Sequence, residues 1–448
     1  MEDTIVAIST STGVGAISII RLSGNDALTI ASKVFTKDLI KVDSHTIHYG
    51  FIKDKNEKID EVLVSVMKAP KTFTREDIVE INCHGGIATT NKVLEVLLEN
   101  GARLAEPGEF TKRAFLNGRI DLLEAEATMD LISSKAESAR KISMNTLTGE
   151  TSNLIRDLRS ELVKIISNIE VNIDYPEYED IEVLTNESIL PGIKKFKEKL
   201  EEIIKKSEDS KVIKEGIKVG IIGRPNVGKS SLLNSLLEEE KAIVTDIPGT
   251  TRDIVEGSLI VGGIPLNIID TAGIRRTEDT VEKIGVEKSL KTIDTSDLLI
   301  YILNNNEEIT EEEKEILEKT KNKKRIIVVN KIDLKTKLDK NLLDNYIEIS
   351  VKENIGIDKI KDEIKRLFNI GEISTNDMTY LSNARSIALL KKSLNNINDA
   401  INEINNNNPI DIVELSLKES WNNLGEVIGE TYTDELLDEL FSRFCLGK

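Results

Sequence analysis

The sequence predicts an α/β domain inserted into a helical domain, with an α+β domain preceding both. Three patterns support this fold class. Short apolar segments alternate with helical patterns between residues 217 and 368, apolar residues recur at helical spacing on both sides of that region, and the first stretch mixes strands with a helix. Because 448 residues are too many for one hydrophobic core, two to three domains are expected.

Residues 1–118 form the predicted α+β domain. Strands are expected in four segments that are rich in Val and Ile, namely 5–8, 16–20, 62–66 and 78–81. A short helix is expected over 91–99, because Gly101 follows it as a stop signal.

Residues 119–215 and 371–448 form the two parts of the predicted helical domain. In the first part, Leu154, Leu158 and Leu162 recur at helical spacing, and a break is expected at Tyr175-Pro176. In the second part, the Asn-rich segment 405–409 interrupts the helical pattern, and we expect a loop there.

Residues 216–370 form the predicted α/β domain. Its expected strands are 217–222, 259–261, 266–269, 298–303, 326–329 and 346–349. Helical patterns separate most of these strands, which predicts a mostly parallel sheet with crossover helices.

Composition and charge restrict the class of protein. Hydrophobic residues make up 39% and charged residues 31%, as in soluble globular proteins. The chain has 60 basic and 78 acidic residues and a net charge of −18, which argues against a broad nucleic-acid surface but leaves room for a local basic patch. No apolar run approaches the roughly 20 residues of a membrane span, and the acidic start is unlike a signal peptide. With only two cysteines, Cys83 and Cys445, we expect a cytoplasmic protein without membrane contact.

A phosphate-binding loop is predicted at Gly223 to Ser230. The segment reads G-x-x-x-x-G-K-S and lies between the expected strand 217–222 and a helical pattern over 231–237. In this motif, backbone N–H groups and the helix N-terminus surround phosphates, Lys229 reaches the β- and γ-phosphates, and Ser230 binds Mg²⁺. The alternative is a glycine-rich turn before an ordinary helix, which the flanking strand disfavours.

Three further motifs follow in order, each at the end of an expected strand. Asp270 to Gly273 supplies a carboxylate near Mg²⁺ and a backbone N–H for the γ-phosphate. Asn330 to Asp333 supplies a carboxylate that accepts from N1–H and the exocyclic amine of guanine, a donor pair that adenine lacks. Ser350 to Lys352 follows the last strand and backs the guanine O6. Strand carboxyl ends are where open α/β sheets bind ligands, so together the motifs predict a GTP site.

The sequence predicts an unusual mechanism of hydrolysis. Many small GTPases have Gln directly after the D-x-x-G motif to orient water, whereas this chain has Ile274. Upstream, the segment 242–253 supplies Thr251 for Mg²⁺ and backbone carbonyls that could join the Asn226 amide oxygen around a monovalent cation. A positive charge there would stabilise the charge that develops on the γ-phosphate.

Taken together, these residues resemble the MnmE (TrmE) family of tRNA-modification GTPases over essentially the whole chain. The resemblance rests on the motifs above, Gly249 to Asp253, Arg21 to Gly24, Glu80 to Gly86 and the final Cys-x-Gly-Lys, Cys445 to Lys448. It implies a Ras-like GTPase domain within a helical domain, after a folate-binding-like and dimerising N-terminal domain. It also implies a reaction, the addition of a carboxymethylaminomethyl group at C5 of the wobble uridine, with 5-formyl- or methylene-tetrahydrofolate as the one-carbon donor. For assembly, it implies a homodimer that forms a heterotetramer with the flavin-dependent partner MnmG (GidA). This partner would contribute most of the tRNA contact.

The resemblance also assigns roles to individual residues. Asn226, Thr245, Ile247 and Thr250 would bind K⁺, Ser230 and Thr251 would bind Mg²⁺, Glu282 would orient water, and Cys445 would act near the uridine. The expected nucleotide and cation site comprises Asn226, Val227, Gly228, Lys229, Ser230, Ser231, Thr245, Asp246, Ile247, Pro248, Gly249, Thr250, Thr251, Asp270, Thr271, Ala272, Gly273, Asn330, Lys331, Asp333, Ser350, Val351 and Lys352. The expected folate contacts are Arg21, Glu80, Arg119 and Lys448.

Simpler interpretations stand beside these assignments. Arg21 and Glu80 fit ordinary strand-face charges, Cys445 fits a small buried hydrophobic residue, and Arg119 stands where the family often has Lys. The motifs also fit a GTP-dependent ribosome-assembly factor without modification chemistry.

Overall fold

The computed structural model describes residues 3–11, 13–134, 136–174, 186–239, 258–269, 293–368 and 379–447. The chain forms two compact units, each assembled from segments that are separate in sequence. Unit 1 comprises Met1–Met129, Leu147–Leu190 and Asn395–Lys448, and unit 2 comprises Asp130–Thr146 and Pro191–Leu394.

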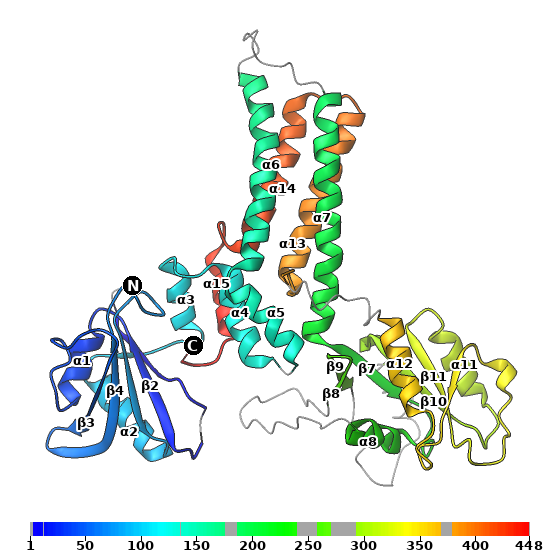
Figure 1. Cartoon of the computed structure of the whole chain (residues 1–448), viewed down its shortest axis with the longest axis horizontal. Helices are drawn as coiled ribbons and strands as arrows, with labels where there is room; N and C mark the ends of the chain where they lie inside the picture. The colour runs from blue at the N-terminus through cyan, green and yellow to red at the C-terminus, as the bar shows by residue number, and fades with distance from the viewer. Residues whose placement is uncertain are drawn as a thin grey trace. The chain divides into compact units, whose positions relative to one another are not determined.

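Unit 1 contains a six-stranded sheet in the order β3-β4-β5-β2-β1-β6 (Figure 1). Its strands are β1 (Ile5–Ile8), β2 (Ile17–Ser23), β3 (Thr46–Asp54), β4 (Glu57–Met67), β5 (Ile78–His84) and β6 (Arg103–Leu104). All neighbours are antiparallel except β1 and β6. The four strands expected here are present, and the two edge strands β3 and β6 are additional strands that the sequence pattern did not predict.

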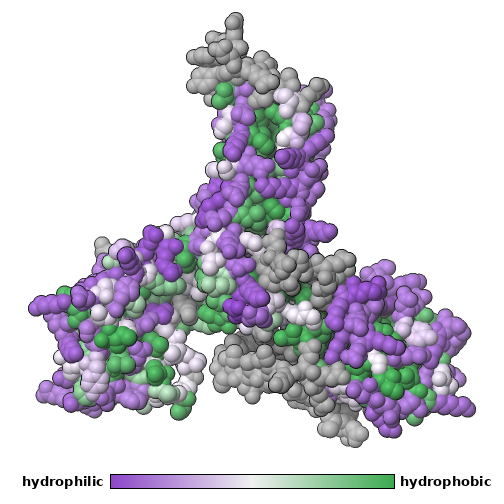
Figure 2. Space-filling view, in the orientation of Figure 1, coloured by the Kyte–Doolittle hydropathy of each residue, from purple (hydrophilic) through white to green (hydrophobic). Residues whose placement is uncertain are grey.

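One face of this sheet is covered by α1 (Ala27–Val34) and α2 (Ile87–Glu99). The helix expected over 91–99 corresponds to α2, which begins four residues earlier, at Ile87. Alternate residues Ile20 and Leu22 of β2 are buried against these helices. Arg21 points to the opposite face, because side chains alternate along a strand. On β3 and β4 that opposite face exposes Ile47, Tyr49 and Leu63, and Figure 2 shows hydrophobic side chains at the surface of the part that holds this sheet.

Helix α3 (Glu109–Leu116) is tied to the sheet by a buried arginine. The Arg113 side chain is 1% exposed and contacts three carboxylates, those of Asp3 (2.9 Å), Glu109 (3.0 Å) and Glu76 (3.2 Å). A buried guanidinium is tolerated only when its charge and donors are satisfied. This network therefore determines where the residues that follow α3, including Arg119, leave the sheet.

The helices on either side of the second sheet in the chain are α4 (Leu122–Ser133), α5 (Glu137–Leu147), α6 (Glu150–Asp174), α7 (Asn186–Glu215), α13 (Ala384–Asn405), α14 (Ile410–Ile428) and α15 (Asp434–Ser442). Within unit 1, α6 packs along α14, where Arg159 lies 3.9 Å from the Trp421 ring centre and Lys418 pairs with Glu170 at 2.7 Å. The loop expected at 405–409 separates α13 from α14, whereas Tyr175-Pro176 lies outside the described residues. Among the described residues, no helix is long and apolar enough to cross a membrane.

Unit 2 contains a second six-stranded sheet, in the order β12-β11-β10-β7-β9-β8, between α7 and α13 in the chain (Figure 1). Its strands are β7 (Ile217–Ile222), β8 (Ser258–Val261), β9 (Ile264–Ile269), β10 (Leu298–Asn304), β11 (Arg325–Asn330) and β12 (Tyr346–Glu348). Every neighbouring pair is parallel except β8 and β9, which confirms the mostly parallel sheet that the strand and helix alternation predicts.

Helices cover both faces of this second sheet. Helices α8 (Lys229–Glu239) and α12 (Ile357–Leu367) pack with Ile300 and Ile302 of β10, while α11 (Glu311–Lys319) packs with Leu299 and Tyr301 on the other face. Strand β10 is buried along its whole length. The loops that leave the carboxyl ends of these strands are therefore held by a rigid core.

Candidate functional site

The predicted phosphate loop joins the end of β7 to the start of α8. Gly223 and Gly228 both have positive φ, and a Cβ at Gly223 would lie 2.5 Å from the carbonyl oxygen of Ile302. A Cβ at Gly228 would overlap the Nδ2 atom of Asn330. Both positions require glycine because the loop packs directly against β10 and Asn330.

Lys229 lies across this loop. Its Nζ donates to the carbonyl oxygens of Gly223 and Arg224, each at 2.7 Å. Burial lowers the pKa of the Lys229 ammonium from its ordinary value. The lysine is the first residue of α8, and the backbone N–H groups at the N-terminus of a helix favour anions.

Asn330 joins the phosphate loop to both segments that are expected to recognise the base. Its side chain is buried, and Nδ2 donates to the Val227 carbonyl at 2.8 Å. Its Oδ1 accepts from the backbone N–H groups of Lys331 (2.8 Å) and Val351 (3.2 Å). A second link runs from Lys331 Nζ to the Asn226 carbonyl at 2.7 Å. These contacts bring three of the predicted motifs together.

Asp333 is exposed at the edge of this assembly. Its Oδ1 accepts a hydrogen bond from the hydroxyl of Ser350 at 2.7 Å, and Ser350 is fully buried. The Ser350 hydrogen bond lowers the pKa of Asp333, so the carboxylate is ionised at neutral pH. An oriented, ionised carboxylate on an exposed side chain is suited to accept from two adjacent N–H groups of a base.

The structure places several other expected residues at this edge. Val227 is buried beneath the loop, whereas Asn226, Ser230, Ser231 and Lys352 are exposed. Outside the described residues lie the expected positions Thr245, Asp246, Ile247, Pro248, Gly249, Thr250, Thr251, Asp270, Thr271, Ala272, Gly273 and Glu282, as does Lys448. Strand β9 ends at Ile269, directly before Asp270.

Two residues at this edge were not predicted from the motifs. Glu307 pairs with Arg224 of the phosphate loop at 3.0 Å and accepts from Asn304 Nδ2 at 2.6 Å. Asn304 is the last residue of β10, so its place at the carboxyl end of a buried parallel strand is the signal that could have identified it. Through Glu307, the end of β10 is therefore linked to Arg224 of the phosphate loop.

Replacing Gly228 with Ala should disrupt the site, because the added methyl group would overlap Asn330 Nδ2 in a backbone conformation that disfavours side chains. We expect GTP affinity to fall about tenfold or more, while the thermal unfolding midpoint changes little. Isothermal titration calorimetry measures the first and calorimetric melting the second. Gly263→Ala is a matched control, since Gly263 also has positive φ but lies in the β8–β9 turn. Equal affinities in both variants would contradict the close packing of the loop against Asn330.

A second group of expected residues meets in unit 1. Arg21 and Glu80 lie opposite each other on β2 and β5, with Arg21 Nε donating to Glu80 Oε1 at 2.8 Å. The Gly447 carbonyl accepts from Ser9 Oγ (3.2 Å) and Arg21 Nη1 (3.5 Å). A Cβ at Gly447 would lie 2.5 Å from the carbonyl oxygen of Ile8, so the tail packs tightly on the sheet.

Two further expected residues, Cys445 and Arg119, have other contacts within unit 1. Cys445 is exposed, which contradicts the interpretation of a small buried hydrophobic residue, and its carbonyl accepts from the Gly108 N–H at 3.4 Å. Arg119 lies over the Phe73 ring, 4.8 Å from its centre. No hydrogen bond among the described residues joins Arg119 to Glu80, and Lys448 lies outside the described residues, so the grouping of the four expected folate contacts stays a prediction.

Cys83 and His84 have separate local partners. Cys83 is buried, its thiol donates to the Ser18 carbonyl at 3.4 Å, and burial raises the pKa of this thiol. The imidazole of His84 lies 2.7 Å from Asp60, whose hydrogen bond raises the pKa of His84.

A mostly parallel sheet with a glycine-rich loop between a buried strand and a helix defines a phosphate-loop nucleotide-binding protein. The family models agree with this class. Residues 122–445 match the model described as the MnmE helical domain, and residues 4–119 match the GTP-binding protein TrmE N-terminus. The chain therefore belongs to the MnmE family.

Relatives and solved structures are similar to the chain to different extents. A tRNA modification GTPase MnmE from Enterococcus faecalis is 53% identical over 457 residues, covering 100% of this chain and 98% of the relative. One from Ligilactobacillus salivarius is 51% identical over 455 residues, with the same coverage of 100% and 98%. The crystal structure of Era in complex with MgGDPNP and nucleotides 1506–1542 of 16S ribosomal RNA is 28% identical, covers 34% of this chain and 56% of that chain, and has a TM-score of 0.26.

Proposed function

We propose that this chain hydrolyses GTP and that its GTPase cycle serves tRNA modification. The observation that carries the proposal is Asn330, which links the phosphate loop through Val227 to the segment that carries Asp333. The phosphate loop and the Asp333 carboxylate, which is suited to bind guanine, therefore lie at the same edge of the sheet. Family membership supports the tRNA part, because relatives with about half of their residues identical are named tRNA modification GTPases.

Mg²⁺ and the triphosphate would be held by the loop residues. Ser230 and Thr251 would supply hydroxyl oxygens, which suit Mg²⁺, and Asp270 a nearby carboxylate. Lys229 and the first N–H groups of α8 would contact the phosphates. When bound, Mg²⁺ neutralises part of the charge that develops during phosphoryl transfer.

K⁺ would be held beside the γ-phosphate by Asn226, Thr245, Ile247 and Thr250. Asn226 supports this proposal because it is exposed and its backbone adopts φ of 60°, an uncommon conformation outside glycine. A cation there supplies positive charge where the transition state gains negative charge. Since Ile274 has no polar group to orient water, Glu282 would take that role.

Hydrolysis in K⁺ should therefore be faster than hydrolysis in Na⁺ at equal ionic strength, by about tenfold or more. Phosphate release under saturating GTP measures the difference. Asn226→Ala is expected to remove most of the preference for K⁺. Equal rates of the unaltered chain in the two salts would show that Asn226 has no such role.

The modification chemistry would involve the second group of residues. Arg21, Glu80, Arg119 and Lys448 would bind a 5-formyl- or methylene-tetrahydrofolate, with cations for its carboxylates and Glu80 for the N–H edge of the pterin. The pairing of Arg21 with Glu80 and the docking of Gly447 beside Arg21 support this assignment. Cys445 would present an exposed thiol near the wobble uridine.

Partners would complete the enzyme. The flavin-dependent protein MnmG (GidA) would join in carboxymethylaminomethyl addition at C5 of the wobble uridine, in a heterotetramer. The apolar side chains Ile47, Tyr49 and Leu63 on the open sheet face support a homodimer, because contiguous exposed apolar side chains mark interaction surfaces. The complex would act in the cytoplasm.

Deleting residues 445–448 should abolish tRNA modification and leave GTP hydrolysis unchanged, because the nucleotide site lies in unit 2 and these residues in unit 1. Mass spectrometry of tRNA nucleosides from a complemented deletion strain tests the first, and phosphate release tests the second. Cys445→Ser is the matched variant that keeps the tail in place, and it separates loss of the thiol from loss of docking. Loss of both activities in the deletion would refute the division of roles.

A further inference from the structure

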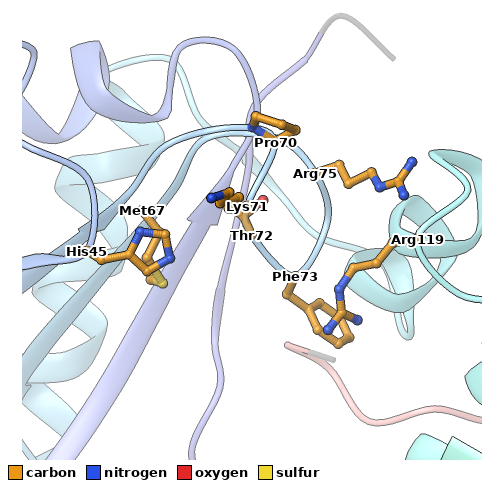
Figure 3. A pocket seen from close by; sticks show the side chains of 8 residues that line it. All are labelled: His45, Met67, Pro70, Lys71, Thr72, Phe73, Arg75 and Arg119. Atoms are coloured by element: carbon orange, nitrogen blue, oxygen red, sulfur yellow. The ribbon is translucent and has the colours of Figure 1, made fainter. Parts of the chain in front are cut away.

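A basic hollow lies at one end of the sheet in unit 1, beside the loop between β4 and β5. Its volume is about 430 Å³, and Lys71, Arg75, Arg119, His45 and Phe73 are among the residues that line it (Figure 3). Figure 3 shows the Arg119 guanidinium beside the Phe73 ring, and the distance to the ring centre is 4.8 Å. Cation–π contact of this kind orients a guanidinium without neutralising it.

The described residues that line this hollow include no carboxylate. The two acidic side chains that follow Arg75 are engaged elsewhere. Glu76 contacts buried Arg113 at 3.2 Å and the Ser23 hydroxyl at 2.7 Å, and Asp77 accepts from the Ala69 N–H at 2.8 Å. Within the described part of the chain, the residues that line this hollow therefore include three basic side chains, Lys71, Arg75 and Arg119, and no acidic one, in a chain whose net charge is −18.

Arg75 is held toward the hollow by an unusual backbone. Its φ is 60°, which a side chain of this size rarely adopts, and its Nη1 donates to the Asn117 carbonyl at 2.9 Å. A local strain of this kind persists only where surrounding contacts support it, and it is concentrated at functional positions. Lys71, Arg75 and Arg119 are all exposed.

We propose that Lys71 and Arg75 of this basic hollow bind backbone phosphates of the RNA substrate, while Arg119 at its border keeps the folate role proposed above; the inference rests on the proposed role in tRNA modification. Guanidinium groups bind phosphate oxygens in pairs, and ammonium groups add charge. An acidic protein can approach RNA only through a local cationic patch, since phosphate contacts dominate affinity. Small-molecule sites enclose most of their ligand, whereas the cations here lie exposed around an open hollow, which suits an extended polyanion.

The test measures binding of a fluorescent tRNA transcript to the full chain at several salt concentrations. The variants are Lys71→Ala and Arg75→Gly, alone and together, with glycine chosen because it accepts the φ of residue 75 without strain. Each loss should weaken binding several-fold, the double variant about tenfold or more, and each should reduce the slope of log affinity against log salt by about 1. Lys58→Ala is the matched control, since Lys58 lies 4.2 Å from the Phe51 ring centre but outside the hollow.

An unchanged calorimetric melting profile of each variant shows that unit 1, which holds the hollow, remains folded. Unchanged tRNA affinity and salt slope in the double variant would overturn the inference and leave the proposed function standing. Loss of 5-formyltetrahydrofolate binding with intact tRNA binding would also overturn it, and would assign the hollow to a small carboxylate ligand. Wild-type tRNA nucleosides in a strain without the gene would instead refute the proposed function itself.

Discussion

Asp333→Asn is expected to weaken GTP binding by about 100- to 1,000-fold. In the proposed role, the carboxylate would accept two hydrogen bonds from guanine, whereas an asparagine amide offers one acceptor and turns an N–H group toward the exocyclic amine. The donor of guanine then faces another donor, and the site loses a charge-assisted pair of bonds. Calorimetric titration with GTP and GDP measures the loss, and ATP should bind equally weakly to both forms.

A nucleotide with matching groups should restore binding to this variant. Xanthine has a carbonyl oxygen where guanine has its exocyclic amine, so the amide that replaces the Asp333 carboxylate can donate to that oxygen while accepting from N1–H. We expect the variant to bind XTP more tightly than GTP, and the unaltered chain to do the opposite. Ser350→Ala is the matched control, because it removes only the hydrogen bond that orients Asp333 and should have a smaller effect. An unchanged preference for GTP in Asp333→Asn would remove this aspartate from base recognition.

Lys229→Ala is expected to slow GTP hydrolysis by about 100- to 1,000-fold under saturating GTP. In the proposed mechanism, the Lys229 ammonium contacts the β- and γ-phosphate oxygens, and its removal would leave the charge that develops there without this direct counter-charge. Single-turnover phosphate release measures the chemical step separately from nucleotide exchange.

Arginine should not replace this lysine. The ammonium fits between two carbonyl oxygens at 2.7 Å, and a planar guanidinium is too large for that position. Lys229→Arg is therefore expected to hydrolyse GTP nearly as slowly as Lys229→Ala. Lys218→Ala on β7 is the control for loss of a positive charge, since that side chain is exposed on the strand before the loop. Full activity of Lys229→Ala would eliminate the lysine from the mechanism.

Strands were predictable where burial on both faces left a continuous apolar pattern. Strand β10 has the sequence LLIYILN with every residue buried, and the predicted segment 298–303 differs from it by one residue. Strand β3 was missed because it is an edge strand whose sequence, TIHYGFIKD, interrupts its apolar residues with His, Gly, Lys and Asp, although its burial alternates. The start of α2 was also misjudged, since its first turn consists of Ile, Ala and two threonines rather than strong helix formers.

Within the candidate site, motifs that are local in sequence were predictable and contacts between distant segments were not. The phosphate loop lies within eight consecutive residues, Gly223 to Ser230. The pairing of Arg21 with Glu80 depends instead on the register of β2 against β5, and a shift of one residue would move one of them to the other face. Glu307 is likewise recognisable only once β10 is known to lie beside β7.

The side chain of Asn330 has a thermodynamic consequence for the nucleotide as a whole. Because one buried amide touches both the Val227 carbonyl and the Val351 N–H, ordering either region lowers the entropy cost of ordering the other. Cooperativity of this type is reciprocal: guanosine should enhance the affinity for pyrophosphate by the same factor by which pyrophosphate enhances the affinity for guanosine. Guanosine alone and pyrophosphate alone would then bind far less tightly than the intact nucleotide that contains both.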